Sequence, residues 1–86
     1  MLENTSMTFG EALEAMKAGK KVSRAGWNGK GMYLYLADGK LLTHEIGDGS
    51  YPFTDSIVMK TADNRYCIGW LASQTDMLAE DWCIVE

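Results

Sequence analysis

Residues 32–36 read Met-Tyr-Leu-Tyr-Leu, a run of aliphatic and aromatic side chains without a charged or small polar residue. This composition is typical of a β-strand. A strand with one face in water alternates apolar and polar residues, so this run predicts a strand that is buried on both faces. The closing residues 82–85, Trp-Cys-Ile-Val, follow the same pattern. One short helix can cover only one face of a sheet, so we expect a second copy of the chain to cover the other.

Residues 9–18 are predicted to form a helix near the start of the chain. Thr8 and Glu11 have the spacing of a capping box, and Gly19 is a stop signal. The apolar side chains recur on one face at helical spacing, so the helix is expected to pack on the sheet. These side chains are Phe9, Ala12, Leu13 and Met16.

Four further strands are expected from short runs between turn signals. They cover residues 21–24, 40–44, 56–60 and 65–70. Asp38-Gly39 is a hairpin signal, so residues 40–44 are expected to form the return strand of a hairpin.

A short helical turn is expected just before the last strand. Ser73 with Asp76 predicts its cap, and the turn covers residues 74–79. These elements favour an α+β fold, with an N-terminal helix packed on a small antiparallel sheet and a short helical turn before the last strand. Since the chain has only 86 residues, we expect residues 1–86 to form a single domain around one core.

The charge balance limits the expected partners. The chain has 12 acidic and 8 basic residues, a formal net charge of −4. Nucleic-acid-binding proteins need clustered Lys and Arg to displace counterions, so neither DNA nor RNA is an expected partner. No run approaches the roughly 20 apolar residues of a membrane-spanning helix, and residues 1–8 lack the pattern of a signal peptide. We therefore expect no membrane partner and a cytoplasmic location.

Metal ligands and catalytic groups are few. Cys67 and Cys83 are expected to be buried free thiols, and only His44 could join them as a metal ligand. We therefore expect neither a metal nor a cofactor. His44 is also the only histidine for acid–base chemistry, and Asp76 with Glu80 is better explained by a helix cap and a solvated face than by a catalytic pair. The sequence predicts a binding protein with no catalytic residue.

The glycine-rich segment 25–31 surrounds Trp27 and allows two interpretations. Its backbone N–H groups could bind an anion, helped by the charges of Arg24 and Lys30. Alternatively, the segment is a plain connection whose tryptophan fills the core. The spacing does not match a P-loop.

Three tryptophans in a chain of this size suggest more than core packing. Trp27 and Trp70 both follow a glycine, Trp27 in an expected loop and Trp70 just before an expected turn, and an indole ring at such a place is suited to stacking on a purine base. Trp82 lies within an apolar run and is expected in the core.

Four segments taken together resemble a family of phage and prophage proteins, the second type of Thoeris anti-defence protein. The resemblance extends over nearly the whole chain from Met7, and its last segment is the most specific. The segments are 8–13 (TFGEAL), 19–22 (GKKV), 24–32 (RAGWNGKGM) and 70–82 (WLASQTDMLAEDW).

The resemblance implies a sponge that sequesters an immune signal without cleaving it. In Thoeris defence a TIR-domain enzyme makes a cyclic ADP-ribose isomer that activates an effector, and the family is similarly thought to include members that bind cyclic oligonucleotides. The family implies a homotetramer with ligand pockets at protomer interfaces. Two alternatives stay open, namely a hydrolase of the same signal and a protein-binding inhibitor of the TIR enzyme or its effector.

The resemblance also suggests roles for individual residues. Trp27 and Trp70 would stack on the adenine. The pyrophosphate would be bound by the side chains of Arg24 and Lys30 and by the backbone N–H groups of Asn28 and Gly29. Base or ribose edges would be bound by Ser73, Gln74, Thr75 and Asp76. Phe9 would line the pocket or pack in the core.

Overall fold

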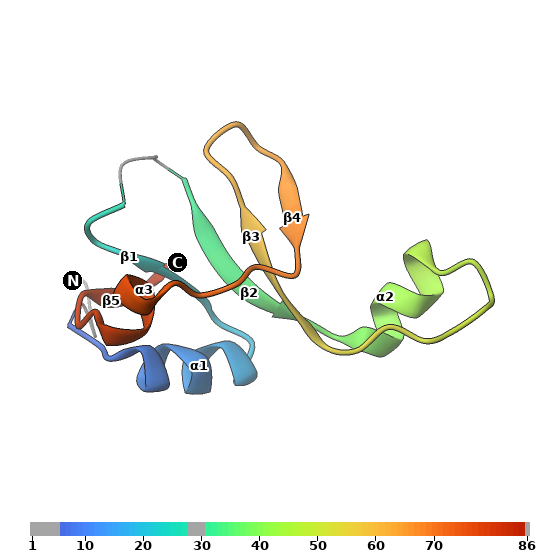
Figure 1. The fold of residues 1–86 in the computed structure, drawn as a ribbon, viewed down its shortest axis with the longest axis horizontal. Helices are drawn as coiled ribbons and strands as arrows, with labels where there is room; N and C mark the ends of the chain where they lie inside the picture. The colour runs from blue at the N-terminus through green and yellow to red at the C-terminus, as the bar shows by residue number, and fades with distance from the viewer. Residues whose placement is uncertain (1–5, 28–30, 86) are drawn as a thin grey trace.

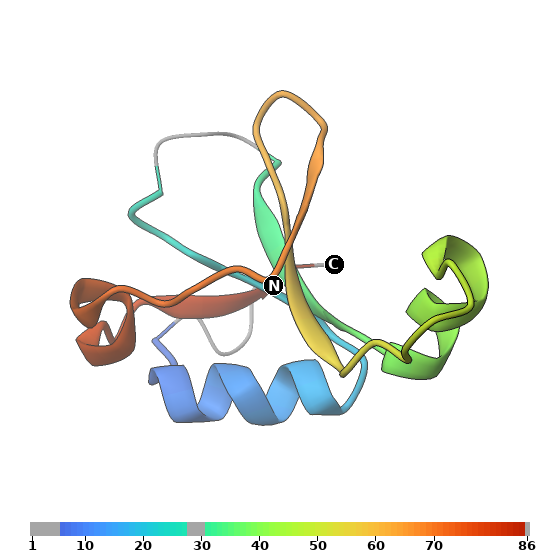
Figure 2. The same cartoon turned by 45° about the vertical axis from the view of Figure 1, so that its right-hand side comes forward.

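The computed structural model describes residues 6–27 and 31–85, which contain three helices and five strands (Figure 1). In chain order they are α1 (Phe9–Lys17), β1 (Lys21–Arg24), β2 (Tyr33–Ala37), α2 (Gly39–Ile46), β3 (Ser56–Lys60), β4 (Tyr66–Ile68), α3 (Gln74–Leu78) and β5 (Trp82–Val85). The strands form an antiparallel sheet in the order β4-β3-β2-β1-β5. Helix α1 packs along one face of the sheet (Figure 2), and α3 directly precedes β5. The predicted α+β fold is confirmed.

Helix α1 begins where the sequence predicts because side chains of its first turn cap it. The Glu11 backbone N–H donates to Thr8 Oγ1 at 3.2 Å, and the Thr8 N–H donates to Glu11 Oε1 at 2.9 Å. The helix ends at Lys17, one residue before the predicted end. Gly19 follows with φ of +89°, a left-handed conformation that glycine adopts without strain and that turns the chain toward β1.

The hydrophobic core lies between α1 and the sheet. Strand pairing places Val22 opposite both Leu34 and Ile84, and Val22 and Leu34 are fully buried. Burial of an aliphatic side chain of this size contributes roughly 1.5–3 kcal/mol. Trp82 is also fully buried, which confirms it as a core residue. The other members of the core come from α1 and the segment before it: Met7, Ala12 and Met16.

The opposite face of the sheet carries a row of tyrosines. Tyr33 and Tyr35 alternate along β2 with the buried Leu34, so their side chains lie on this face. The rings of Tyr35 and Tyr66 meet edge-on, with centroids 6.0 Å apart. Both β2 tyrosines are half-buried, and among the described helices only α1 packs broadly on the sheet, on its other side. On β2, Leu34 is thus fully buried toward α1 while both tyrosines are only half-buried on the other face, and a second copy on the tyrosine face stays a prediction.

The return strand predicted at residues 40–44 is wrong, because this segment belongs to helix α2. Asp38 is the N-terminal cap of the helix, and its carboxylate accepts the Lys40 backbone N–H at 2.8 Å. Gly39 lies so close to the returning chain that an added Cβ would stand 2.7 Å from the carbonyl carbon of Thr54. The glycine therefore permits a close approach of two backbone segments and does not form a hairpin turn.

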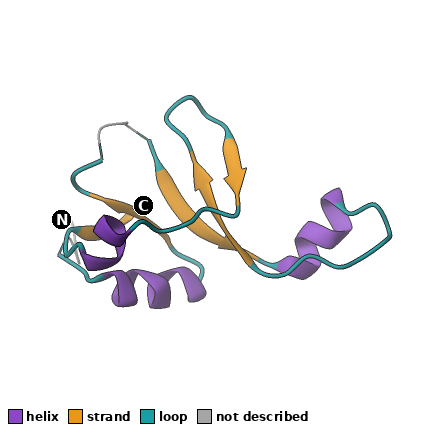
Figure 3. Cartoon of the chain, in the orientation of Figure 1, coloured by secondary structure: helices purple, strands orange, loops and turns teal. Residues whose placement is uncertain are grey.

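Helix α2 and the loop after it, residues 38–55, form an arm that projects from the sheet (Figures 1 and 3). The arm lies at the opposite end of the molecule from α3, and the molecule measures 42 Å along its longest axis against 27 and 26 Å across it. Helix α2 packs broadly against no other described helix or strand. Large apolar side chains of the arm are consequently exposed: Leu41, Ile46, Tyr51 and Phe53.

Smaller differences concern β4, the cysteines and the histidine. The strand predicted at 65–70 is only three residues long, because Gly69 turns the chain with φ of +89°. Cys67 lies on this edge strand and is exposed, so its predicted burial is wrong, whereas Cys83 is half-buried and both thiols are free. His44 is exposed on α2 instead of on a hairpin. None of the described helices is long and apolar enough to cross a membrane.

Candidate functional site

Four aromatic side chains from separate parts of the chain meet at the end of the sheet next to α3. We call Phe9, Trp27, Trp70 and Trp82 the aromatic cluster. The ring centroid of Trp82 lies 5.3 Å from that of Phe9, 5.5 Å from that of Trp27 and 6.3 Å from that of Trp70. Trp82 is fully buried and the other three are half-buried. Three of the predicted site residues are therefore brought together around a core tryptophan.

The position of the Trp82 ring is fixed from two directions. Its indole N–H donates to the backbone oxygen of Asp76 at 3.0 Å, which links β5 to α3. Its backbone exchanges two hydrogen bonds with Met7, of 2.9 and 3.2 Å, which links β5 to the segment before α1. A buried indole N–H needs such an acceptor. Trp82 thus gives the partly exposed rings a rigid base.

The rings of the cluster meet at an angle. The centroids of Trp27 and Trp70 are 6.5 Å apart with 64° between the ring planes, and Phe9 lies 6.4 Å from Trp70 at 51°. These values fall in the range of favourable edge-to-face pairs. A base held between two rings needs parallel planes, so in this arrangement a purine could stack on one indole and meet the other only at its edge.

Arg24 does not lie free beside the cluster. Its Nε donates to Asp81 Oδ1 at 2.9 Å and its NH1 donates to Asp76 Oδ1 at 3.0 Å. The second oxygen of Asp81 accepts the Gly26 backbone N–H at 3.1 Å. We call Arg24, Asp76 and Asp81 the carboxylate clamp. The side chains of Arg24 and Asp76 are only 18% and 16% exposed, and that of Asp81 is 34% exposed.

The clamp shifts the pKa values of all three members. Hydrogen bonds to Asp81 and then to Asp76 raise the pKa of Arg24, and the bond from Arg24 is the main cause of the lowered pKa of Asp81. Burial by itself raises the pKa of Asp76, but hydrogen bonds from Ser73 and Arg24 outweigh it and the net pKa is lowered. All three groups are therefore charged at neutral pH, and the clamp carries a net charge of −1.

The polar residues predicted from the 70–82 segment lie at the start of α3. Ser73 and Asp76 form the predicted capping box, because the Asp76 N–H donates to Ser73 Oγ at 3.1 Å and the Ser73 N–H donates to Asp76 Oδ2 at 3.1 Å. Both side chains thus already have hydrogen-bond partners within the protein. Gln74 and Thr75 are exposed in the same turn.

The structure leaves part of the predicted site untested and adds two residues to it. Asn28, Gly29 and Lys30 lie outside the described residues. Trp82 and Asp81 were not predicted as part of the site, although both contact its predicted members. The strand pairing of Arg24 with Trp82 brings these residues together, and this pairing cannot be read from either segment alone.

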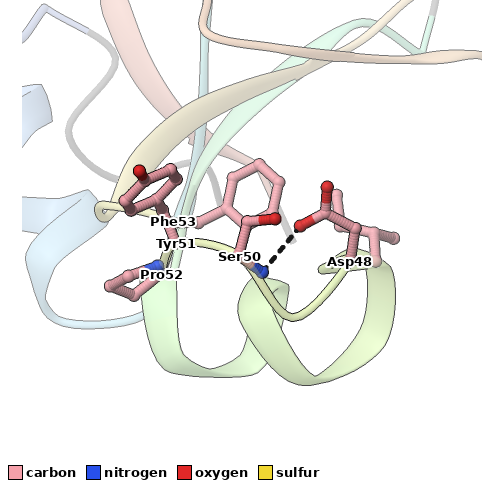
Figure 4. A pocket seen from close by; sticks show the side chains of 6 residues that line it. Asp48, Ser50, Tyr51, Pro52 and Phe53 are labelled. Carbon is pink, nitrogen blue, oxygen red and sulfur yellow. Dashed lines mark hydrogen bonds between the residues drawn. The ribbon is translucent and has the colours of Figure 1, made fainter.

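Two open hollows lie elsewhere on the molecule. One of about 380 Å³ lies on the arm (Figure 4), where the Asp48 carboxylate accepts the Ser50 N–H at 2.9 Å. The other, of about 400 Å³, lies between the end of α1 and the start of α2, where Lys17 and Lys40 line it. Neither is lined by a residue of the aromatic cluster. Within the described ranges, no three His, Cys, Asp or Glu side chains are grouped closely enough to hold a metal ion.

Comparison with known proteins places this arrangement in a family. Residues 7–85 match the family described as the Thoeris anti-defense 2-like domain. The chain is also 49% identical, over 87 aligned residues, to the protein named Thoeris anti-defense 2 of Bacillus phage SP01, and the alignment covers 94% of this chain and 97% of that relative. The match includes every described member of the aromatic cluster and of the carboxylate clamp. The chain belongs to the Thoeris anti-defense 2 family.

Proposed function

We propose that this protein inhibits Thoeris anti-phage defence by binding a cyclic ADP-ribose isomer and holding it intact. The observation that carries the proposal is the convergence of Phe9, Trp27 and Trp70, each half-buried, around the buried Trp82. Half-buried indoles on a rigid base offer ring faces on which a purine can stack. The family membership supplies the context for the signal, and cyclic oligonucleotides are further ligands to test.

We propose binding without catalysis because the acidic groups next to the cluster are already occupied. Asp76 and Asp81 accept hydrogen bonds from Arg24, and the pKa values of both carboxyl groups are lowered. Both groups are therefore ionised at neutral pH and have no proton to donate as general acids. His44 lies on the arm, at the other end of the molecule. Neither a metal nor a cofactor has a part in this proposal.

We propose that the protein works as a homo-oligomer, and as a homotetramer by analogy with the resemblance noted above. Two surfaces support an assembly: the tyrosine face of the sheet, which no described helix covers broadly, and the exposed apolar side chains of the arm. Such an assembly would bring further groups to the rings of the cluster. We place the protein in the cytoplasm of an infected host cell, without a DNA, RNA or membrane partner.

The test separates binding from cleavage. The purified protein is incubated with a cyclic ADP-ribose isomer, freed of unbound ligand by gel filtration and denatured, and the released compound is identified by chromatography. We expect the intact isomer from the wild type and much less from Trp27→Ala and Trp70→Ala. Asp63→Ala is the control, because this side chain is 66% exposed in the turn between β3 and β4, outside the aromatic cluster, the tyrosine face and the arm.

Other outcomes have distinct meanings. Release of linear ADP-ribose would identify a hydrolase. Absence of any bound compound, with loss of a complex with the TIR enzyme or its effector in Trp27→Ala, would identify a protein-binding inhibitor. Light scattering of the same sample measures the mass of the assembly, and a monomeric mass would refute the oligomer.

A further inference from the structure

We infer that Arg24 is a positioning residue that holds Trp27 against Trp82, and that it does not act by neutralising the phosphates of the ligand. The inference rests on the proposed function, because it assigns a task within the proposed ligand site. The inference is based on the carboxylate clamp, which joins the end of β1, helix α3 and the residue before β5.

Each hydrogen bond of the clamp involves a residue that is next to a tryptophan of the aromatic cluster or hydrogen-bonded to one. Asp81 directly precedes Trp82, and its Oδ2 accepts the N–H of Gly26, the residue before Trp27. The backbone repeats this link, because the Ala25 N–H donates to the Asp81 oxygen at 2.9 Å. The turn that carries Trp27 is thus tied to the residue that precedes Trp82.

The second carboxylate extends the link to α3. Asp76 binds Arg24 through its side chain, while its backbone oxygen accepts the Trp82 indole N–H at 3.0 Å. The Trp27 N–H also donates to the Arg24 oxygen at 3.2 Å. One guanidinium therefore joins β1, α3 and the start of β5 around the two rings, which lie 5.5 Å apart. A planar fork with several fixed donors suits this task, and a lysine ammonium does not.

The charges argue against a phosphate site at Arg24. Its single positive charge faces two carboxylates within 3.0 Å, so a pyrophosphate approaching the clamp meets a net negative group. To bind the guanidinium through these donors it would have to displace a partly buried carboxylate, which then loses its hydrogen bonds. The guanidinium keeps further N–H donors, but it is only 18% exposed and the net charge of the clamp disfavours an anion there, so the inference assigns the phosphates to a cation outside the clamp.

The decisive experiment uses substitutions for which the two roles predict opposite signs. Asp81→Asn keeps the shape of the side chain and removes one negative charge. If Arg24 neutralises phosphate, this variant leaves more of the positive charge of Arg24 available to the phosphates, and calorimetry shows tighter binding of a cyclic ADP-ribose isomer. If Arg24 positions Trp27, the affinity falls by about tenfold, because the charge-assisted bonds that order the site are weakened. We expect the fall.

Arg24→Lys gives a second, independent comparison. A phosphate-binding role tolerates lysine, whereas the positioning role does not, so we expect this variant to bind as weakly as Arg24→Gln. The matched controls are Arg65→Lys and Asp63→Asn, which alter the exposed ion pair of 3.3 Å between these two residues. Both controls should keep the wild-type affinity.

A ligand-free measurement keeps the inference separate from the proposed function. The near-ultraviolet circular dichroism of the tryptophans reports the fixed contact of Trp27 with Trp82, and we expect it to weaken in Asp81→Asn and Arg24→Lys while far-ultraviolet spectra show retained secondary structure. If the wild type binds no cyclic ADP-ribose isomer, the proposed function fails, and this spectrum alone decides the inference. Tighter binding by Asp81→Asn, or an unchanged tryptophan spectrum in both variants, overturns the inference and leaves the proposed function standing.

Discussion

Replacement of Trp82 by phenylalanine tests whether this one ring supports both the core and the aromatic cluster. The side chain is fully buried, contacts the rings of Phe9, Trp27 and Trp70, and donates to the Asp76 oxygen at 3.0 Å. Phenylalanine keeps one aromatic ring in place. It removes the second ring of the indole and the buried N–H, so the variant measures these two contributions together.

The expected loss of stability is about 1.5–3.5 kcal/mol, the sum of two contributions. Loss of the hydrogen bond costs about 0.5–1.5 kcal/mol. The space left by the missing ring adds roughly 1–2 kcal/mol, a fraction of the 3–5 kcal/mol typical when a buried aromatic is cut back to alanine. In a domain of this size about 1 kcal/mol lowers the Tm by roughly 4–8 °C, so the Tm should fall by about 6–28 °C.

Urea unfolding followed by far-ultraviolet circular dichroism measures the loss, and a thermal scan checks the shift in Tm. Leu71→Ala serves as the control, because Leu71 is 89% exposed and its truncation should cost less than about 0.5 kcal/mol. If Trp82→Phe unfolded within about 0.5 kcal/mol of the wild type, our reasoning that Trp82 anchors the cluster would be refuted.

The remaining predictions concern the arm, acid stability and the thiols. Gly39→Ala should favour opening of α2 by about 1–3 kcal/mol in amide hydrogen exchange, because the new Cβ meets the backbone of the returning chain. The folded pKa values of Asp76 and Asp81 are lowered, so the unfolded chain takes up protons first and stability, measured by urea unfolding, is lost as the pH falls below about 4; Asp81→Asn should make this loss shallower. A thiol reagent should modify the exposed Cys67 at once and the half-buried Cys83 slowly, in two phases of absorbance.

Each of these predictions has a control with the opposite or no expected effect. Gly10→Ala should stabilise α1 by about 0.5–1 kcal/mol, because an added Cβ there stands 3.9 Å from its nearest neighbour and alanine favours a helix. Asp63→Asn, at an exposed position, should leave the acid profile unchanged. Cys67→Ser should remove only the fast phase. Unchanged exchange of α2, stability that rises in acid, or rapid loss of the Cys83 thiol would contradict the corresponding prediction.

Local signals in the sequence were sufficient for the two capped helices. The capping boxes at Thr8 and Ser73 were predicted from spacing and are present, because cap and helix lie within one turn. The wrong prediction at α2 arose because a local signal was ambiguous there. Asp38 can cap a helix or open a turn, and what decides between them is the approach of Gly39 to a segment about fifteen residues away.

The site shows the same division between local and distant information. The loop tryptophans Trp27 and Trp70 were predicted as site residues from their glycine neighbours, and they do meet. That they meet on Trp82 depends on the pairing of β1 with β5. The partners of Arg24 lie 52 and 57 residues away, so the sequence could show its charge but not that two carboxylates already balance it.

The arm can be expected to unfold locally without the rest of the molecule. Since α2 packs broadly against no other described helix or strand, we expect its eight residues to unfold and refold locally while the sheet keeps its pairing. An isolated helix this short is marginal in water. Its amide protons should therefore exchange much sooner than those of β2 and β3 at its base. For the same reason, we expect insertions or deletions between these strands to cost the core little stability.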